Sequence, residues 1–358
     1  MISARFIPLF VALAVFSSAF PRLVLARSPE AQACVDSWLH QGRPFRVELN
    51  HRFPMSHSQG ENGTCYAHAL LAGLSAIQQQ DFSGDSSTLG DPKAYVREFD
   101  YSPELTLLLL ALVDDEFIRE RIESSRRFSK TALFDNGFAS RLYARIKLYP
   151  QALISVPNDL KLSLFSSVRG ALLSAFEKVT DLGPQTTIDE VRDRIRAVLP
   201  PVFEAAQKKP ELAGFVAELR KKGWSWNSER QVLKNAQWLK WLPYSMRVIS
   251  PKTMNECLEM KGQILTSLCE GKPVVISFAD WSSNGSIHAT VVSGVGRYEG
   301  KVVLMMRDSK FRNREGTISN PHQTLKPFPL DQACQLSGGQ FTLFRTEIFE
   351  GLALENQQ

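Results

Sequence analysis

The chain has 358 residues, of which 44% are hydrophobic and 22% are charged; these values are ordinary for a globular protein that buries a large core. The formal net charge of +5 is small, so the composition gives no reason to expect a nucleic-acid partner. The cysteines are dispersed and the sequence holds no His-x-x-x-His or Cys-x-x-Cys pattern, so we expect neither a metal site nor a cofactor.

Residues 1–26 have the pattern of a secretory signal peptide. Arg5 supplies the positive N-terminal region, residues 6–20 form an apolar stretch that is short for a membrane span, and Val24-Leu25-Ala26 suits a cleavage site. We therefore expect an exported protein, periplasmic or secreted, with no membrane span after removal of the signal.

Residues 27–159 are predicted to contain an N-terminal segment and a helical lobe. A polar, glycine-rich stretch over 59–64 leads into Cys65, and a helix is predicted to follow. Its apolar positions recur at spacings of three and four, at Ala67, Leu70, Leu71, Leu74 and Ile77. With Thr64 as N-cap, Cys65 lies in the first turn, where free N–H groups and the helix dipole favour a nucleophilic thiolate. The alternative is a buried structural cysteine.

Two more helices are expected in this part of the chain. Ser102 and Pro103 suit the N-cap and first position of an apolar helix that continues to residue 113. The turn residues of 135–139 precede a helical pattern over 142–148.

Residues 160–248 are predicted to form a helical insertion. Thr187 and Glu190 fit a capping box, and Pro200-Pro201 is expected to end that helix. The segment holds four of the six tryptophans, with lysines among them: Trp224, Trp226, Trp238 and Trp241. These residues fit a subdomain that buries its own aromatic side chains, and they also fit a cap over a cleft or a partner surface.

Residues 249–358 are predicted to form a β-lobe, which makes the whole chain α+β. Short β-rich runs cover 273–278, 289–292, 302–306 and 341–344. His288 stands at the head of the second run, and Asp308 follows the third. A neutral imidazole can accept the proton of a thiol and later return it to a leaving group.

Export would permit disulfide bonds. If Cys65 is a free nucleophile, four cysteines remain, and they can pair in three ways. The local option joins Cys257 to Cys269 and leaves Cys34 with Cys334, while four unpaired thiols are the other possibility.

The stretch around Cys65 resembles the active-site segment of papain-like cysteine peptidases. The residues that match the family's spacing are Gln59, Gly63, Cys65, Tyr66 and Ala67. The resemblance implies a two-lobed fold with Cys65 as nucleophile and His288 as base. It implies that Asp308 accepts the Nδ1–H of His288 and that Gln59 donates to an oxyanion. It further implies a substrate site at Gly63, Gly137 and Ile287.

The sequence departs from the family at several positions. Lys310 replaces a tryptophan that shields the histidine pair, with Phe311 as a substitute aromatic and Asn313 as a second candidate to orient His288. Phe138 replaces the second glycine of a substrate-binding loop. Asn62 and Asp135 stand where many members have a disulfide. The separation of Cys65 and His288 exceeds the roughly 130–150 residues of papain relatives, which makes 160–248 an insertion.

These features predict an exported cysteine peptidase that acts on a peptide or protein substrate. An amidase, deamidase or transpeptidase would use the same three residues. A papain-fold protein that binds without turnover is the third hypothesis, and the missing tryptophan and the aspartate in place of asparagine favour it.

Overall fold

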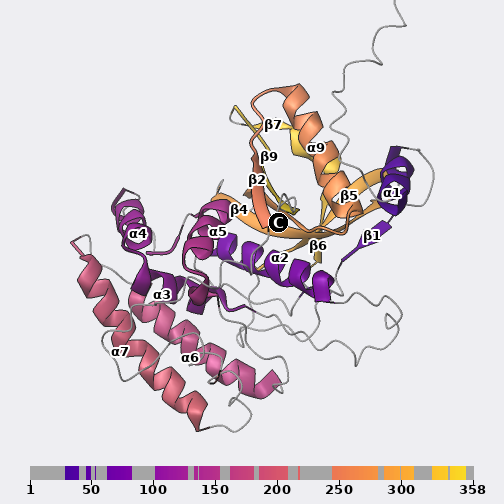
Figure 1. Ribbon diagram of the computed structural model, residues 1–358. Coiled ribbons are helices and arrows are strands. Elements are labelled where there is room, and N and C mark those ends of the chain that lie inside the picture. The colour runs from indigo at the N-terminus through magenta and orange to yellow at the C-terminus, as the bar shows by residue number, and fades with distance from the viewer. Residues whose placement is uncertain are drawn as a thin grey trace, which may run out of the picture.

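An antiparallel sheet and a group of helices lie on either side of α2 (Cys65–Phe82), and further helices pack on the sheet itself (Figure 1). The predicted α+β class is therefore confirmed. The computed structural model describes residues 29–39, 46–49, 53, 63–82, 101–127, 133–135, 137–153, 162–180, 185–208, 217, 244–280, 286–298, 300–309, 325–337 and 339–351. The predicted signal peptide lies outside these residues.

Seven strands form the main sheet, all of them paired antiparallel. The order is β2-β9-β3-β4-β5-β6, and β1 pairs with the far end of β4. The strands are β1 (Arg46–Glu48), β2 (Tyr244–Ile249), β3 (Val274–Asp280), β4 (Ser286–Tyr298), β5 (Lys301–Arg307), β6 (Leu325–Pro329) and β9 (Leu343–Gly351). A short second pair is formed by β7 (Leu336–Ser337) and β8 (Gln340–Phe341).

The long strand β4 changes partners along its length, and this places the candidate site. It pairs with β3 from Ser286 to Val292 but with β5 only from Val291 onward, with an irregularity between Val292 and Gly294. Among the described strands, none pairs with the first residues of β4 on the β5 side, and α2 packs against this strand.

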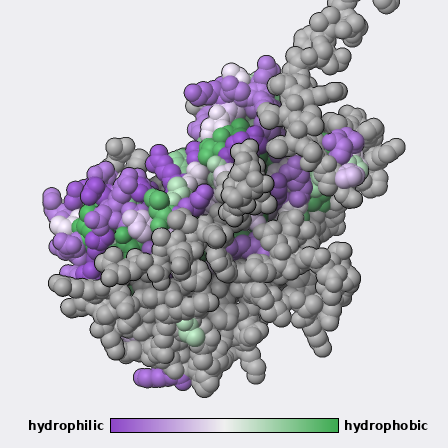
Figure 2. Space-filling model, in the orientation of Figure 1, coloured by the Kyte–Doolittle hydropathy of each residue, from purple (hydrophilic) through white to green (hydrophobic). Residues whose placement is uncertain are grey.

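The helices α3 to α7 gather on one side of the sheet (Figure 1). They are α3 (Pro103–Val113), α4 (Asp115–Arg127), α5 (Ala139–Leu148), α6 (Leu162–Thr180) and α7 (Ile188–Gln207), with the 3-10 turn η4 (Pro150–Ala152). On the other side are α1 (Pro29–Leu39), α9 (Met254–Cys269) and the 3-10 turn η9 (Leu330–Cys334). Hydrophilic side chains predominate on the exposed part of α4 in Figure 2.

Two predicted helix starts are confirmed. The Ser102 hydroxyl caps α3 by accepting from the Leu105 N–H at 3.2 Å. Thr187 and Glu190 form the capping box ahead of α7, through bonds of 2.7 and 3.3 Å between each side chain and the other's backbone N–H.

The prediction that Pro200-Pro201 ends this helix is wrong, because α7 continues to Gln207 with both prolines inside. Two prolines remove only two N–H donors. Packing holds the helix through them, since Leu199 is 2% and Val202 is 6% exposed.

The end of the predicted insertion also needs correction. Residues 244–248 were assigned to the helical segment 160–248, but they belong to β2, which pairs with β9 over its whole length. Pro243 precedes the strand, and Tyr244, Met246 and Val248 alternate with polar residues, which is a strand period. The four tryptophans lie outside the described residues.

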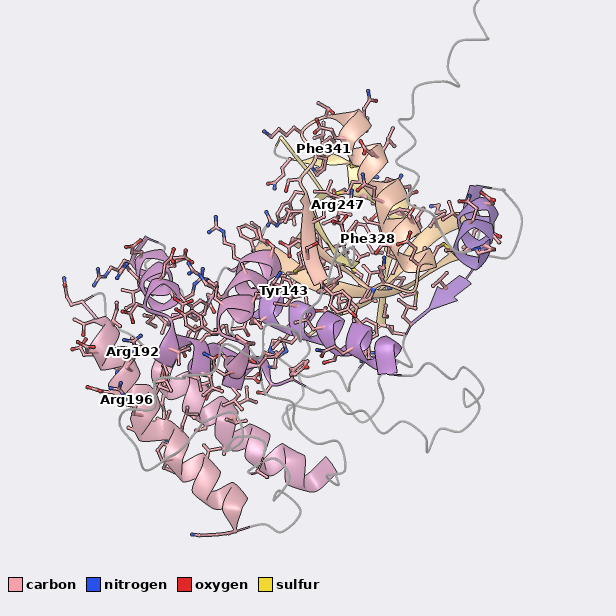
Figure 3. All side chains as sticks on the ribbon, viewed as in Figure 1. Tyr143, Arg192, Arg196, Arg247, Phe328 and Phe341 are labelled. Carbon is pink, nitrogen blue, oxygen red and sulfur yellow. A yellow bond between two sulfur atoms is a disulfide. The ribbon has the colours of Figure 1, made fainter. Side chains whose placement is uncertain are left out.

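Side chains connect the helical part to the sheet. The buried Glu347 carboxylate on β9 accepts from the Ser140 N–H at 3.2 Å and the Ser140 hydroxyl at 2.9 Å, at the start of α5. The Tyr143 hydroxyl donates to the carbonyl of Tyr244 at 2.7 Å, and Figure 3 places Tyr143 beside the sheet. These contacts fix α5 against the edge strand β2 and its neighbour β9.

Two disulfides join the terminal parts of the chain, Cys34–Cys269 and Cys257–Cys334. The local pairing of Cys257 with Cys269 is therefore wrong. Both residues lie in α9, whose length between them, at about 1.5 Å per residue, far exceeds the reach of a disulfide. Among the helices that the structure describes, none is both long and apolar enough to cross a membrane.

Candidate active site

Cys65 is the first residue of α2, as predicted. The carbonyl of Thr64 accepts from the N–H groups of Ala67 at 2.9 Å and His68 at 3.2 Å, which puts Thr64 at the N-cap position. The other four cysteines of the chain form the disulfides, so Cys65 carries the free thiol. Its side chain is buried at the junction of the helix and the sheet.

The structure brings His288 and Asp308 to this thiol. His288 is 4% exposed on β4, and its Nε2 lies 2.7 Å from Asp308 Oδ1. Burial lowers the pKa of His288, but hydrogen bonds and charges from Asp308 and Cys65 together raise it to about 9. Asp308 therefore engages Nε2 and not the predicted Nδ1, which leaves Nδ1 for the sulfur.

A backbone group also contacts the sulfur. The N–H of Ala289 donates to Cys65 Sγ at 3.4 Å. This donor is available because β5 pairs with β4 only from Val291 onward. The sulfur thus lies against both the His288 ring and a main-chain N–H, where a negative charge on sulfur would be stabilised.

Strand register explains how the residues around His288 meet. Met306 on β5 pairs with Val292 on one side and with Lys326 on the other. Side chains alternate between the two faces of a strand, so Asp308, two residues after Met306, lies on the same face as Met306 and Lys326. His288 lies four residues before Val292, and it is therefore on this face too. Diagonal neighbours on one face are within reach of long side chains.

Asp308 is more enclosed than the sequence suggested. A lysine in place of the shielding tryptophan would leave the carboxylate better solvated, yet Asp308 is only 6% exposed. The aromatic cover comes from other strands. The Phe278 ring on β3 lies edge-on to His288 with centroids 5.6 Å apart, and Phe328 on β6 packs on Phe278 at 5.9 Å.

Lys326 reaches the same carboxylate from β6. Its Nζ forms an ion pair with Asp308 Oδ2, while Oδ1 binds His288. Sequence analysis missed Lys326, Phe278 and Phe328, because nothing local marks them. Only the pairing of β5 with β6 and of β3 with β4 would have revealed them.

The approach to Cys65 is held by the segment around Asp135. The N–H of Gly63 donates to Asp135 Oδ1 at 2.6 Å. The hydroxyl of Tyr66 donates to the carbonyl of Phe134 at 2.9 Å, and burial raises the pKa of Tyr66 to about 12. A Cβ on Gly137 would lie 2.3 Å from the Tyr66 ring, so Gly137 has a packing role as well as its predicted contact with substrate.

Some of the remaining predicted residues lie in the described part of the chain, and others lie outside it. Ile287 is 58% exposed beside His288. The rival His68 is buried with its Nε2 3.4 Å from Glu104 Oε1 on α3. Gln59, Lys310, Phe311 and Asn313 lie outside the described residues, as do the histidines at 40, 51, 57 and 322. In the described part of the chain no cluster of three or more potential metal ligands occurs.

Comparisons with known proteins add little to this geometry. No family model and no curated protein matches the chain. Procathepsin L 3 from the larval midgut of Tenebrio molitor is 11% identical, with 79% of this chain and 69% of that chain covered and a TM-score of 0.33. PepW from Lactobacillus rhamnosis HN001 is 13% identical, with coverages of 91% and 84% and a TM-score of 0.39. Superpositions this loose do not decide function.

Proposed function

We propose that this chain is an exported cysteine peptidase with a papain-like arrangement of two lobes. The observation that carries the proposal is one contact set. A free thiol at a helix start meets a buried imidazole, whose other nitrogen is bound by a buried carboxylate. Nucleophile, base and orienting group in hydrogen-bonded series are the pattern of covalent acyl transfer.

The steps follow from these positions. Cys65 Sγ attacks the carbonyl carbon of a peptide bond, and the carbonyl oxygen becomes an oxyanion, which Gln59 and the Cys65 N–H stabilise. The bond to nitrogen breaks as the imidazolium of His288 protonates the leaving amine. Water then attacks the thioester, gives its proton to His288 and releases the carboxylic acid. Asp308 keeps the ring oriented and stabilises the imidazolium throughout.

A substrate would lie along the segments that border the sulfur. Gly63 and Gly137 flank the start of α2, and the side chain of Ile287 is exposed next to His288. Glycines let a peptide backbone approach closely, and the exposed isoleucine offers an apolar contact. We assign these three residues to substrate binding.

Export is the second part of the proposal. Two disulfides connect parts of the chain that are far apart in sequence, and structural disulfides are typical of oxidising compartments. They support the periplasmic or secreted location that residues 1–26 predict.

The test is hydrolysis of a peptide library by wild type, Cys65→Ala and Cys65→Ser. We expect cleavage by wild type alone, because serine lacks the nucleophilicity of a thiolate at this site. Cys65 carries the free thiol, so labelling with a peptidyl thiol-reactive electrophile reports on this residue directly. Hydrolysis that survives Cys65→Ala, or labelling no faster than that of a free thiol in solution, would contradict the proposal.

Transfer to an amine is the second candidate reaction. The thioester intermediate accepts an amine as readily as water if the cleft admits one, and the same three residues serve both reactions. Adding a primary amine to the assay separates them: a peptidase gives the acid as the main product, and a transpeptidase gives the amide.

A further inference from the structure

We propose that Lys326 is a positioning residue that balances the charge of Asp308 and so limits how firmly His288 holds its proton. This proposal deepens the proposed function at the same site. The sequence gives no local sign of it, since Lys326 stands on β6, well after Asp308 and without a motif around it.

The contacts place Asp308 between the imidazole of His288 and the ammonium group of Lys326. One carboxylate oxygen lies 2.7 Å from Nε2 of His288, and the other forms the ion pair with Nζ of Lys326. The Asp308 side chain is 8% exposed, so the carboxylate is largely removed from water. Burial makes its interactions with both partners stronger than those of a surface pair.

The charged groups near His288 come from several elements. Cys65 approaches from α2, Asp308 from the end of β5, and Lys326 through Asp308 from β6. Opposite His288, β3 presents the uncharged ring of Phe278. The nearby Arg307 directs its guanidinium over the ring of Phe53, 5.0 Å from the centroid. Among these described groups, Lys326 is the cation that contacts Asp308.

The direction of the effect follows from charge. A carboxylate favours the imidazolium, and a lysine that shares the carboxylate weakens this preference. Removing the positive charge at Lys326 therefore raises the pKa of His288 above its present value of about 9. The Lys326 side chain is 58% exposed, so solvent screening reduces the effect, and we expect a shift of about half to one pKa unit.

The experiment follows the titration of His288 by nitrogen NMR in the substrate-free protein. Lys326→Met should raise the midpoint, while Lys326→Arg should leave it unchanged because the charge remains. Lys301→Met is the matched control: it removes one exposed lysine at the other end of β5, roughly 20 Å away at about 3.3 Å per residue, and should cause no shift.

A double-mutant cycle tests whether Lys326 acts through Asp308. In an Asp308→Asn background, Lys326→Met should no longer move the midpoint. A midpoint in Lys326→Met within about 0.2 pKa units of wild type, or a shift that persists in the Asp308→Asn background, would overturn the proposal.

Turnover provides the second readout. The alkaline limb of the pH profile of kcat/KM should move upward in Lys326→Met by the same amount as the NMR midpoint. The NMR titration needs no substrate, so an absence of peptidase activity would contradict the proposed function and leave the result on Lys326 standing. A titration without a shift would overturn the role of Lys326 even in an active peptidase.

Discussion

Different interactions hold the sulfur and the imidazole of the candidate site: close packing around Cys65 and charge around His288. At the start of α2, backbone groups and glycines are packed without space to spare: Gly63 bonds to Asp135 at 2.6 Å, and Gly137 lies against the ring of Tyr66. Around His288, side chains on strands β4 to β6 are held by charge, through Asp308 and Lys326.

This difference predicts two kinds of sensitivity. A larger side chain near Cys65 has to move the backbone, because the atoms there are already in close contact. A change of charge near His288 leaves the packing in place and alters the proton affinity of the ring. The first region should respond to substitution through folding and reactivity, and the second through pH.

The largest effect is expected for Gly137→Ala. The new Cβ would lie 2.3 Å from the ring of Tyr66, which is 2% exposed and anchored by its hydroxyl to the carbonyl of Phe134. The ring cannot move without losing that bond, so we expect a loss of about 3 kcal/mol in the free energy of unfolding, and slow alkylation of Cys65. Urea unfolding and the rate of reaction with iodoacetamide measure the two effects.

Gly262→Ala is the matched control for this change. A Cβ on Gly262, within α9, meets nothing within 4 Å, and alanine is a better helix former than glycine by about 0.5–1 kcal/mol. This variant should be as stable as wild type or more so. If Gly137→Ala is as stable as Gly262→Ala, close packing does not hold the region around Cys65.

Asp308→Ala should have the next largest effect and tests the other side. Without the carboxylate, His288 loses its orienting partner, and we expect kcat/KM to fall on the order of 10²-fold. Asp308→Asn keeps an acceptor for Nε2 and should lose less. Because Asp308 raises the pKa of His288, both variants should shift the alkaline limb of the pH profile downward. An unchanged alkaline limb in both variants would show that Asp308 does not set the pKa of His288.

Asp135→Ala probes the contact that holds the approach to Cys65. The Gly63 N–H would lose its acceptor, at a cost of about 1–2 kcal/mol, and turnover should fall about tenfold as the segment before Cys65 loosens. Asp135→Asn retains an oxygen at the same place and should stay within about threefold of wild type. Asp36→Ala, on the exposed face of α1, is the control. Equal losses in the alanine and asparagine variants would mean that the charge of Asp135, and not its hydrogen bond, matters.

Features that depend on local spacing could be predicted from the sequence. The helix that begins at Cys65, the cap of Ser102 and the strand that carries His288 depend on local spacing, which a sequence displays directly. The sequence analysis did not predict α9, although its capping box of Thr253 with Glu256 is a local signal.

The rest depended on contacts between distant segments. The pairing of Lys326 with Asp308 needs the register of β5 and β6, and the cover over His288 needs Phe278 and Phe328 from two other strands. The disulfide partners of Cys257 and Cys269 were likewise set by tertiary packing, since both residues lie on one helix. Local patterns predict the elements, whereas strand register decides which side chains share a face.

The smallest effect is expected for Ile287→Ala. This variant tests substrate binding separately from the packing around Cys65 and the charges around His288. Ile287 is 58% exposed, so its truncation should change the free energy of unfolding by less than about 0.5 kcal/mol and leave the His288 titration where it is. If its side chain contacts substrate, the lost apolar contact is worth about 1 kcal/mol, and kcat/KM should fall about fivefold, mainly through KM. Val248→Ala, at another exposed apolar position, on β2, is the control. A variant with normal kinetics would remove the Ile287 side chain from the substrate site, and one with a shifted pH profile would place it among the residues that tune His288.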